Sequence, residues 1–145
     1  MGLRRMVVCL AAVALAAFLA AGCFFGGGER EEPKRVVASF LEDLASKRFE
    51  QAVSRLSGDA LDAAGSLLPA LRAMDYEAKV SDLELRVTEY SRSSGRALVD
   101  ARYRLEQRVP GYGTVVQDVW AAFHLRRVGG EWKICLAYTV ARGSK

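Results

Sequence analysis

The sequence predicts an α+β domain in which three helices precede an antiparallel sheet of about four strands. Apolar residues recur at helical spacing from Val36 to Leu71. From about Tyr76 onward they alternate with polar residues, as in half-buried strands. Helices first and strands afterwards is the order expected of an α+β fold.

The first helix is predicted from about residue 33 to residue 46. Pro33 suits a first helical turn, because the N–H that proline lacks has no helical partner there. Glu31 and Glu32 place negative charge near that end. One helical face then carries five apolar residues: Val36, Val37, Phe40, Leu41 and Leu44.

Two further helices are predicted from the same spacing. The shorter one carries four apolar residues: Phe49, Ala52, Val53 and Leu56. Asp59 is predicted as the N-cap of the other helix, because a carboxylate can accept hydrogen bonds from free N–H groups there. Pro69 is expected to kink or split this helix. Its apolar stripe has four members: Leu61, Ala64, Leu68 and Leu71.

The strands are predicted from alternation with period two. Three apolar residues alternate with polar neighbours in the first strand: Leu83, Leu85 and Val87. The second strand has a continuous apolar face: Ala97, Val99, Ala101, Tyr103 and Leu105. A break at residues 110–113 leads into the third, with its own apolar set: Val115, Val119, Ala121, Phe123 and Leu125. One face of the sheet is therefore available for the helices.

Gly129 and Gly130 predict a two-residue turn, with both glycines at positive φ, into a fourth strand from Trp132 to Val140. The resulting register pairs four couples: Val128 with Glu131, Leu125 with Ile134, Phe123 with Leu136, and Ala121 with Tyr138. This register places the apolar side chains of both strands on one side. A slip of one residue would expose them to water.

The N-terminus has the features of an exported lipoprotein. Arg4 and Arg5 form a positive segment, and residues 6–21 are uncharged but shorter than the roughly 20 apolar residues of a membrane span. Residues 19–23, Leu-Ala-Ala-Gly-Cys, resemble the lipobox of bacterial lipoproteins, although that pattern prefers leucine where Ala20 stands. The resemblance implies cleavage between Gly22 and Cys23 and a diacylglyceryl group on the Cys23 thiol. An ordinary secretory signal and an uncleaved anchor are the alternatives.

Three segments are therefore predicted: a signal peptide at 1–22, a lipidated flexible tether at 23–32, and one domain at 33–145. The tether is rich in glycine and charge and has no periodicity. We expect the domain outside the cytoplasm, held to the cell membrane or the outer membrane by the lipid on Cys23.

Charge and cysteine content narrow the function classes. Removal of Arg4 and Arg5 with the signal lowers the formal net charge from +4 to +2, and the basic residues are scattered among acidic ones. No nucleic-acid partner is expected. Of the three cysteines, Cys9 leaves with the signal and Cys23 would be acylated. Cys135 is then a lone thiol, and no intrachain disulfide can form.

The helices, together with strands that end in Phe-His-Leu-Arg-Arg-Val-Gly-Gly-Glu-Trp-Lys-Ile at 123–134, resemble the nuclear transport factor 2-like (NTF2-like) superfamily. Residues 36–44 and 49–52 are similar to the first two helices of its small bacterial lipoprotein members. The resemblance implies a cone-shaped domain with a strongly curved sheet. It implies a function among ketosteroid isomerase, dehydratases and non-catalytic binding or dimerisation domains, whose enzymes place a carboxylate base or a His/Asp pair inside the cone.

The side of the sheet on which each strand residue falls distinguishes between catalytic and non-catalytic functions. Three aromatic residues fall on the apolar side as core or cavity-lining candidates: Tyr103, Phe123 and Tyr138. Three ionisable residues fall on the other side: Asp100, Asp118 and His124. We expect no catalytic residues, because no base and oxyanion donor converge in one dry pocket. The expected function is a non-catalytic module, without cofactor, that binds a small apolar ligand or an envelope protein. The alternative is a small isomerase- or dehydratase-like envelope enzyme that uses the cone cavity.

Two registers of the second and third strands remain open. If paired residue numbers sum to 224, Asp100 faces His124, which the Gly-Gly turn places opposite Cys135; such a line could activate a thiolate. If they sum to 222, the polar face becomes a surface of ion pairs and cation–π contacts. Three pairs then form: His124 faces Leu98, Asp118 faces Arg104 and Trp120 lies by Arg102. No metal site is expected in either case, since too few ligands gather.

Trp120 and Ala122 are apolar where a solvated strand would be polar. Exposed aromatic residues in a sheet often mark an interface, and NTF2-like proteins commonly dimerise through the outer face of the sheet. Trp120 and Arg102 are therefore candidate interface residues for a homodimer or an envelope partner. The alternative is a single tryptophan covered by arginine stems.

Overall fold

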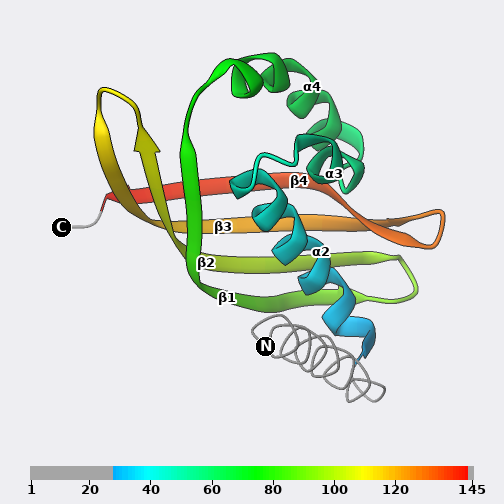
Figure 1. Ribbon diagram of the computed structural model, residues 1–145. Coiled ribbons are helices and arrows are strands. Elements are labelled where there is room, and N and C mark those ends of the chain that lie inside the picture. Colours follow the sequence, from blue (N-terminus) through cyan, green and yellow to red (C-terminus); the bar gives the residue numbers. More distant parts are fainter. Residues whose placement is uncertain (1–27, 144–145) are drawn as a thin grey trace, which may run out of the picture. The chain divides into compact units, whose positions relative to one another are not determined.

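The computed structural model describes residues 28–143, in which three helices precede one four-stranded sheet (Figure 1). The elements are α2 (Gly28–Ala45), α3 (Phe49–Ser54), α4 (Gly58–Ala73), β1 (Glu77–Ser91), β2 (Arg96–Val109), β3 (Gly113–Val128) and β4 (Glu131–Gly143). The strands are antiparallel in the order β1-β2-β3-β4. The predicted α+β architecture is confirmed.

Helix α2 starts earlier than the sequence predicts. Gly28–Glu32, assigned to the tether, form its first turns, so Pro33 lies inside the helix and not at its start. Pro33 cannot donate a hydrogen bond to the carbonyl of Glu29, and its ring crowds that carbonyl, so the first turns are held less firmly than the rest of the helix. Glu29 and Glu31 in the first turn favour the earlier start through the helix dipole.

Helix α4 differs from its prediction in its N-cap. Its N-cap is Ser57, whose carbonyl accepts the N–H of Leu61 at 3.4 Å, and Asp59 falls in the first turn. Pro69 lies inside α4 and does not split it; it lacks the N–H that would bond to the carbonyl of Gly65. Helix α3 begins at Phe49 but ends at Ser54, so Leu56, predicted as part of this helix, lies beyond its end.

The β2–β3 register is the one in which paired residue numbers sum to 222. Leu98 faces His124, Arg102 faces Trp120 and Arg104 faces Asp118. On the opposite face seven of the predicted apolar residues are buried, namely Ala97, Val99, Ala101, Val119, Ala121, Phe123 and Leu125. Tyr103 and Leu105 are half-buried, and Val115 is exposed, contrary to the prediction. Period two therefore identified both the strands and their inner face.

The β3–β4 hairpin has the predicted turn, with Gly129 and Gly130 at φ values of 59° and 83°. Its register is as predicted only as far as the pair Leu125 and Ile134. Beyond it, a bulge at Cys135 adds one residue to β4 and reverses the faces of the later β4 residues. Three expected pairings are therefore wrong: Phe123 faces Ala137 and not Leu136, Ala121 faces Thr139 and not Tyr138, and His124 faces Leu136 and not Cys135.

Strand β1 turns through a sharp bend in Figure 1. Its register with β2 shifts across residues 82 and 83, where Asp82 has a φ of 53°. Bulges of this kind bend a strand and interrupt alternation. Leu85 and Val87 are half-buried as predicted, whereas Leu83 is exposed.

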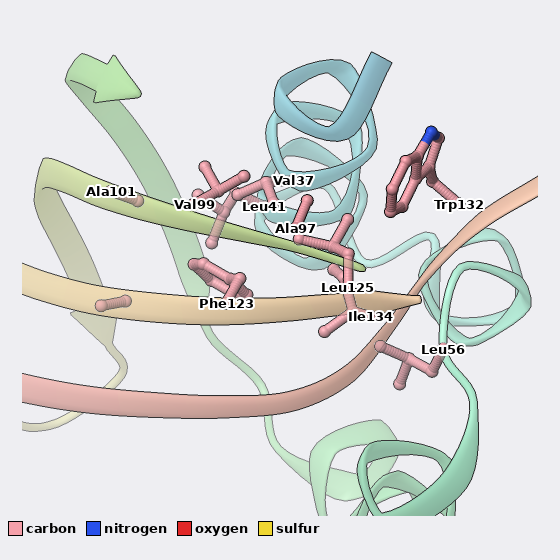
Figure 2. Packing of buried hydrophobic residues seen from close by; sticks show 11 residues of the cluster. Val37, Leu41, Leu56, Ala97, Val99, Ala101, Phe123, Leu125, Trp132 and Ile134 are labelled. Atoms are coloured by element: carbon pink, nitrogen blue, oxygen red, sulfur yellow. The ribbon is translucent and has the colours of Figure 1, made fainter. Parts of the chain in front are cut away.

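The core lies between α2 and the inner face of the sheet (Figure 2). Val37 and Leu41 of α2 are buried with Val99 and Leu125 of the sheet. The ring of Phe123 meets that of Phe40 edge to face, with centroids 6.2 Å apart. Every residue of this buried cluster lies between residues 37 and 134, and Glu32–Lys145 form one compact unit. A fragment of residues 28–145 thus keeps the whole core.

A buried carboxylate ties α2 to α3. Asp43 accepts a hydrogen bond from Nε of Arg48 and another from Nε of Arg55, both at 3.0 Å. These arginines stand just before and just after α3. Beyond α3, backbone bonds of 2.8 and 2.9 Å join Arg55 and Ser57 to Ile134 and cover the edge of β4.

Candidate functional site

An apolar pocket of about 260 Å³ lies between the three helices and β4. Helix α2 contributes Phe40 and Leu44, and β4 contributes Leu136 and Ala137. The helical segment from residue 49 onward supplies the other lining residues: Phe49, Ala52, Val53, Leu56, Asp59, Ala60, Ala63, Ala64, Leu67, Leu68 and Leu71. All but Asp59 are apolar.

The pocket exists because α4 does not close onto the domain. None of its residues is buried, and Leu67, which lines the pocket, is 58% exposed. Arg72 of α4 pairs with Glu50 of α3 at 3.2 Å, but both side chains are largely in water, where such a pair contributes little. The helix therefore leaves apolar surface uncovered, and the pocket reaches solvent beside Leu67.

The chemistry of the pocket is that of a hydrocarbon site. No lining side chain except Asp59 can form a strong hydrogen bond, so a polar ligand group inside would lose its water without replacement. Asp59 is exposed at the start of α4. Its carboxylate would repel an acidic ligand. A neutral apolar molecule fits these properties best.

The three predicted cavity aromatics lie in three different places. Phe123 is part of the tight core against Phe40 and does not line the pocket. Tyr103 is half-buried on the inner face, where burial raises the pKa of its phenol. Tyr138 is turned to the outer face by the Cys135 bulge, is 59% exposed, and meets His124 edge to face at 5.9 Å.

Sequence reasoning missed part of the pocket lining. Of the apolar stripe predicted on α4, Ala64, Leu68 and Leu71 line the pocket, whereas Leu61 is exposed. Three residues outside the stripe also line it: Ala60, Ala63 and Leu67. The sequence of α4 did contain one indication of the pocket. Apolar residues occupy more than one face of α4, and only Asp59, Asp62 and Arg72 are ionisable over its 16 residues.

The Cys-His-Asp line is absent from the outer face. Asp100 faces Ala122, not His124, and Cys135 sits in the bulge, where its thiol donates to the carbonyl of His124 at 3.3 Å. Within residues 28–143, His, Cys, Asp and Glu side chains do not gather in groups of three or more that could hold a metal ion.

The candidate interface residues do meet. The guanidinium carbon of Arg102 lies 3.9 Å from the centre of the Trp120 ring, and Trp120 remains 40% exposed. Next to them Arg104 Nε lies 3.3 Å from Asp118 Oδ1. This is the ion-pair and cation–π surface predicted for the 222 register.

Two predicted site residues, Gly22 and Cys23, lie outside the described residues. Within residues 28–143, none of the helices combines the length and apolar character needed to cross a membrane.

Comparison with known proteins identifies the fold. No protein-family model and no curated protein matches the sequence. The chain is similar in structure to a candidate dehydratase of the NTF2-like family from Streptomyces avermitilis, with a TM-score of 0.58 and 15% identity over 79% of this chain and 97% of the other.

Two other solved structures are similar to the same extent. A hexachlorocyclohexane dehydrochlorinase has a TM-score of 0.57 and 10% identity over 81% of this chain and 91% of its own. The intermembrane space region of the chloroplast protein ARC6 has a TM-score of 0.59 and 17% identity over 75% and 94%. At such identities the likeness shows the fold alone, which is NTF2-like.

Proposed function

We propose that this chain is a membrane-anchored, non-catalytic binding module that takes a neutral apolar molecule into the pocket beneath α4. One observation carries this function: among the lining residues only Asp59 is ionisable. A site whose lining is apolar except for one carboxylate, at the start of α4, selects its ligand mainly by apolar surface.

The size of the pocket limits the ligand. A cavity of about 150 Å³ holds a benzene molecule, which corresponds to roughly 25 Å³ per carbon atom. A volume of about 260 Å³ then suits about ten carbon atoms. A medium-length alkyl chain or a two-ring hydrocarbon has this size.

Catalysis is the second function to weigh, because the fold is shared with a candidate dehydratase and a dehydrochlorinase. Such reactions need a base and a hydrogen-bond donor on opposite sides of one bound substrate. Here the exposed Asp59 is accompanied by no side-chain donor among the lining residues, and Tyr103 is not one of them. This composition supports binding over proton transfer.

Titration of the fragment of residues 28–145 with 1-decanol tests the binding function. We expect saturable binding by calorimetry, weakened at least about tenfold by Ala64→Glu, which places a carboxylate in the pocket. Ala70→Glu is the matched control, because Ala70 is on the same helix, is exposed and does not line the pocket. It should change affinity by less than about twofold. Absence of binding, or equal effects of both variants, contradicts the function.

The membrane anchor is a separate part of the proposed function, supported by the lipobox-like residues 19–23. Mass spectrometry of the N-terminal peptide from bacteria that express the full chain should show a lipid-modified cysteine at position 23. Cys23→Ser should abolish the modification. A mature chain that is cleaved elsewhere and carries no lipid would contradict the anchor.

A further inference from the structure

One cross-strand row of the sheet concentrates positive charge. Elsewhere each arginine of β2 has a carboxylate in its row: Arg102 has Glu84, Arg104 has Asp118 and Arg108 has Glu77. The remaining β2 arginine is Arg96, which faces Ser91 on β1 and Arg126 on β3, and Arg126 in turn faces Lys133 on β4. Three cations thus follow one another in a row without an acidic residue.

The middle of this row has no counter-charge. Lys133 lies 3.3 Å from a carboxylate oxygen of Glu131 and donates to the carbonyl of Ser54. The side chains of Arg96 and Arg126, by contrast, make no ion pair, hydrogen bond or ring contact with the described part of the chain. Like charges directly opposite each other destabilise a sheet. A bound anion would relieve that repulsion.

These arginines also line a groove of about 580 Å³ that crosses all four strands. Ser91 and Ser94 of the β1–β2 hairpin and His124 of β3 line it with them and can supply further hydrogen bonds. Leu98 and Leu136 face His124 from either side and provide apolar surface. The groove thus combines two guanidinium groups with a patch for a neutral portion of a ligand.

Two acidic residues restrict the ligand. Glu89 and Asp59 also line the groove, but neither lies in the arginine row; Glu89 faces Leu98 on the row beside it, and Asp59 belongs to α4. They disfavour a polyanion, whose further charges would meet carboxylates. A ligand with one anionic group is therefore favoured.

We infer that Arg96 and Arg126 form a binding site for a single phosphate group, carried by a small molecule whose neutral part lies over Leu98 and Leu136. A carboxylate is satisfied by one guanidinium fork, whereas the oxygens of a phosphate can accept from two forks at once. The site lies on the outer face of the sheet. It shares Asp59 and Leu136 with the pocket beneath α4, but Arg96 and Arg126 do not line that pocket. The phosphate can belong to a soluble monoester or to a lipid headgroup.

Calorimetry on the full chain in a non-ionic maltoside detergent, at constant ionic strength, tests this site with two probes. Glycerol 3-phosphate represents a soluble monoester, and dihexanoyl-phosphatidylglycerol represents a lipid headgroup. Saturable binding of either probe that Arg96→Gln and Arg126→Gln each weaken at least about tenfold supports the site. The probe that binds more tightly identifies the source of the phosphate.

Arg108→Gln is the matched control, because it removes one positive charge from the same strand outside the groove. It should weaken binding by less than about twofold. The site is overturned if neither probe saturates, if Arg108→Gln weakens binding as much as Arg96→Gln, or if acetate binds as tightly as glycerol 3-phosphate.

Stability measurements separate loss of the site from loss of the fold. Because Arg126→Gln removes a like-charge opposition, its melting temperature without ligand should equal or exceed that of the unmodified chain. If Arg126→Gln melts lower, Arg96→Lys serves instead. It keeps the charge but loses the fork, and it should bind about three- to tenfold more weakly with unchanged melting. Binding as tight as that of the unmodified chain would show that no fork is needed.

Discussion

Helices α2 and α4 are of similar length, 18 and 16 residues, and both carry apolar residues at helical spacing, yet only α2 is buried. Val37 and Leu41 of α2 lie in the core, whereas α4 has no buried residue. An apolar stripe shows that a helix has surface to cover. It does not show whether the domain itself supplies the cover.

The polar contacts that attach the two helices differ in the same way: those of α2 are buried and that of α4 is exposed. The Asp43 carboxylate, held by two arginines, fixes the end of α2 to α3 in a buried setting. Between α4 and α3 the ion pair joins Arg72 to Glu50 in largely exposed positions. Helix α2 therefore carries the stability of the fold, and α4 is available for a ligand.

Matched leucine truncations should give the largest difference between the helices. In the fragment of residues 28–145, Leu41→Ala is expected to lower the free energy of unfolding by about 3 kcal/mol, through lost burial and a cavity. Leu67→Ala should lower it by less than about 0.5 kcal/mol, because Leu67 is mostly in water. Urea unfolding measures both. Similar losses for the two variants would refute the division of roles.

Asp43→Asn tests the attachment of α2. It should cost about 2 kcal/mol, less than removal of a fully buried partner, because the side chains of Arg48 and Arg55 are 47% and 34% exposed and can regain water. Urea unfolding of the same fragment measures the cost. Glu50→Gln, which breaks the α3–α4 pair, is the control, with an expected cost below about 0.5 kcal/mol. A cost for Asp43→Asn no larger than that of the control would contradict the role of the Asp43 carboxylate in attaching α2 to α3.

The outer face of the sheet sharpens the comparison further, since the sequence predicts Trp120 and Arg102 there as interface residues and not as a source of monomer stability. Trp120→Ala should cost the monomer at most about 1 kcal/mol, from the cation–π contact with Arg102. If the face mediates dimerisation, light scattering coupled to size exclusion should show a dimer that Trp120→Ala converts to monomer. A strict monomer before and after the substitution would remove the interface.

The smallest expected effect is on the pH dependence of stability, through Tyr103 on the inner face of the sheet. Burial raises the pKa of Tyr103 above its ordinary value of 10.0. The folded domain then keeps the phenol proton at a pH where the unfolded chain loses it. Stability is full below pH 10 and falls as pH rises toward the folded pKa. Tyr103→Phe should flatten this decline in urea unfolding between about pH 9 and about pH 11. An unchanged slope would mean that Tyr103 is not desolvated.

Sequence pattern predicted the elements well because burial on one face of a strand forces period two. The inner residues of β2 and β3, the Gly129–Gly130 turn and the Arg102–Trp120 contact follow from parity and one register choice. Parity fails where an extra residue enters a strand. The bulge at Cys135 leaves no signature in an apolar stretch, and it moved Tyr138 to the wrong face.

The pocket could not be predicted for a different reason. Whether Leu67 meets the core or water depends on how far α4 stands from β4, which is a tertiary distance and not a spacing in the sequence. The row of three cations on the outer face also depends on tertiary structure. Arg96 and Arg126 are 30 residues apart and become neighbours only once the β2–β3 register is known.

Hydrogen exchange of backbone amides in the fragment of residues 28–145, with and without saturating 1-decanol, tests most directly that α4 is a helix available to an apolar ligand. Without ligand, α4 amides should exchange much faster than those of α2. With 1-decanol they should slow by about tenfold or more, while those of α2 stay unchanged. If the amides of the two helices exchange equally slowly without ligand, and those of α4 do not respond to 1-decanol, the proposal that α4 is available to an apolar ligand is contradicted.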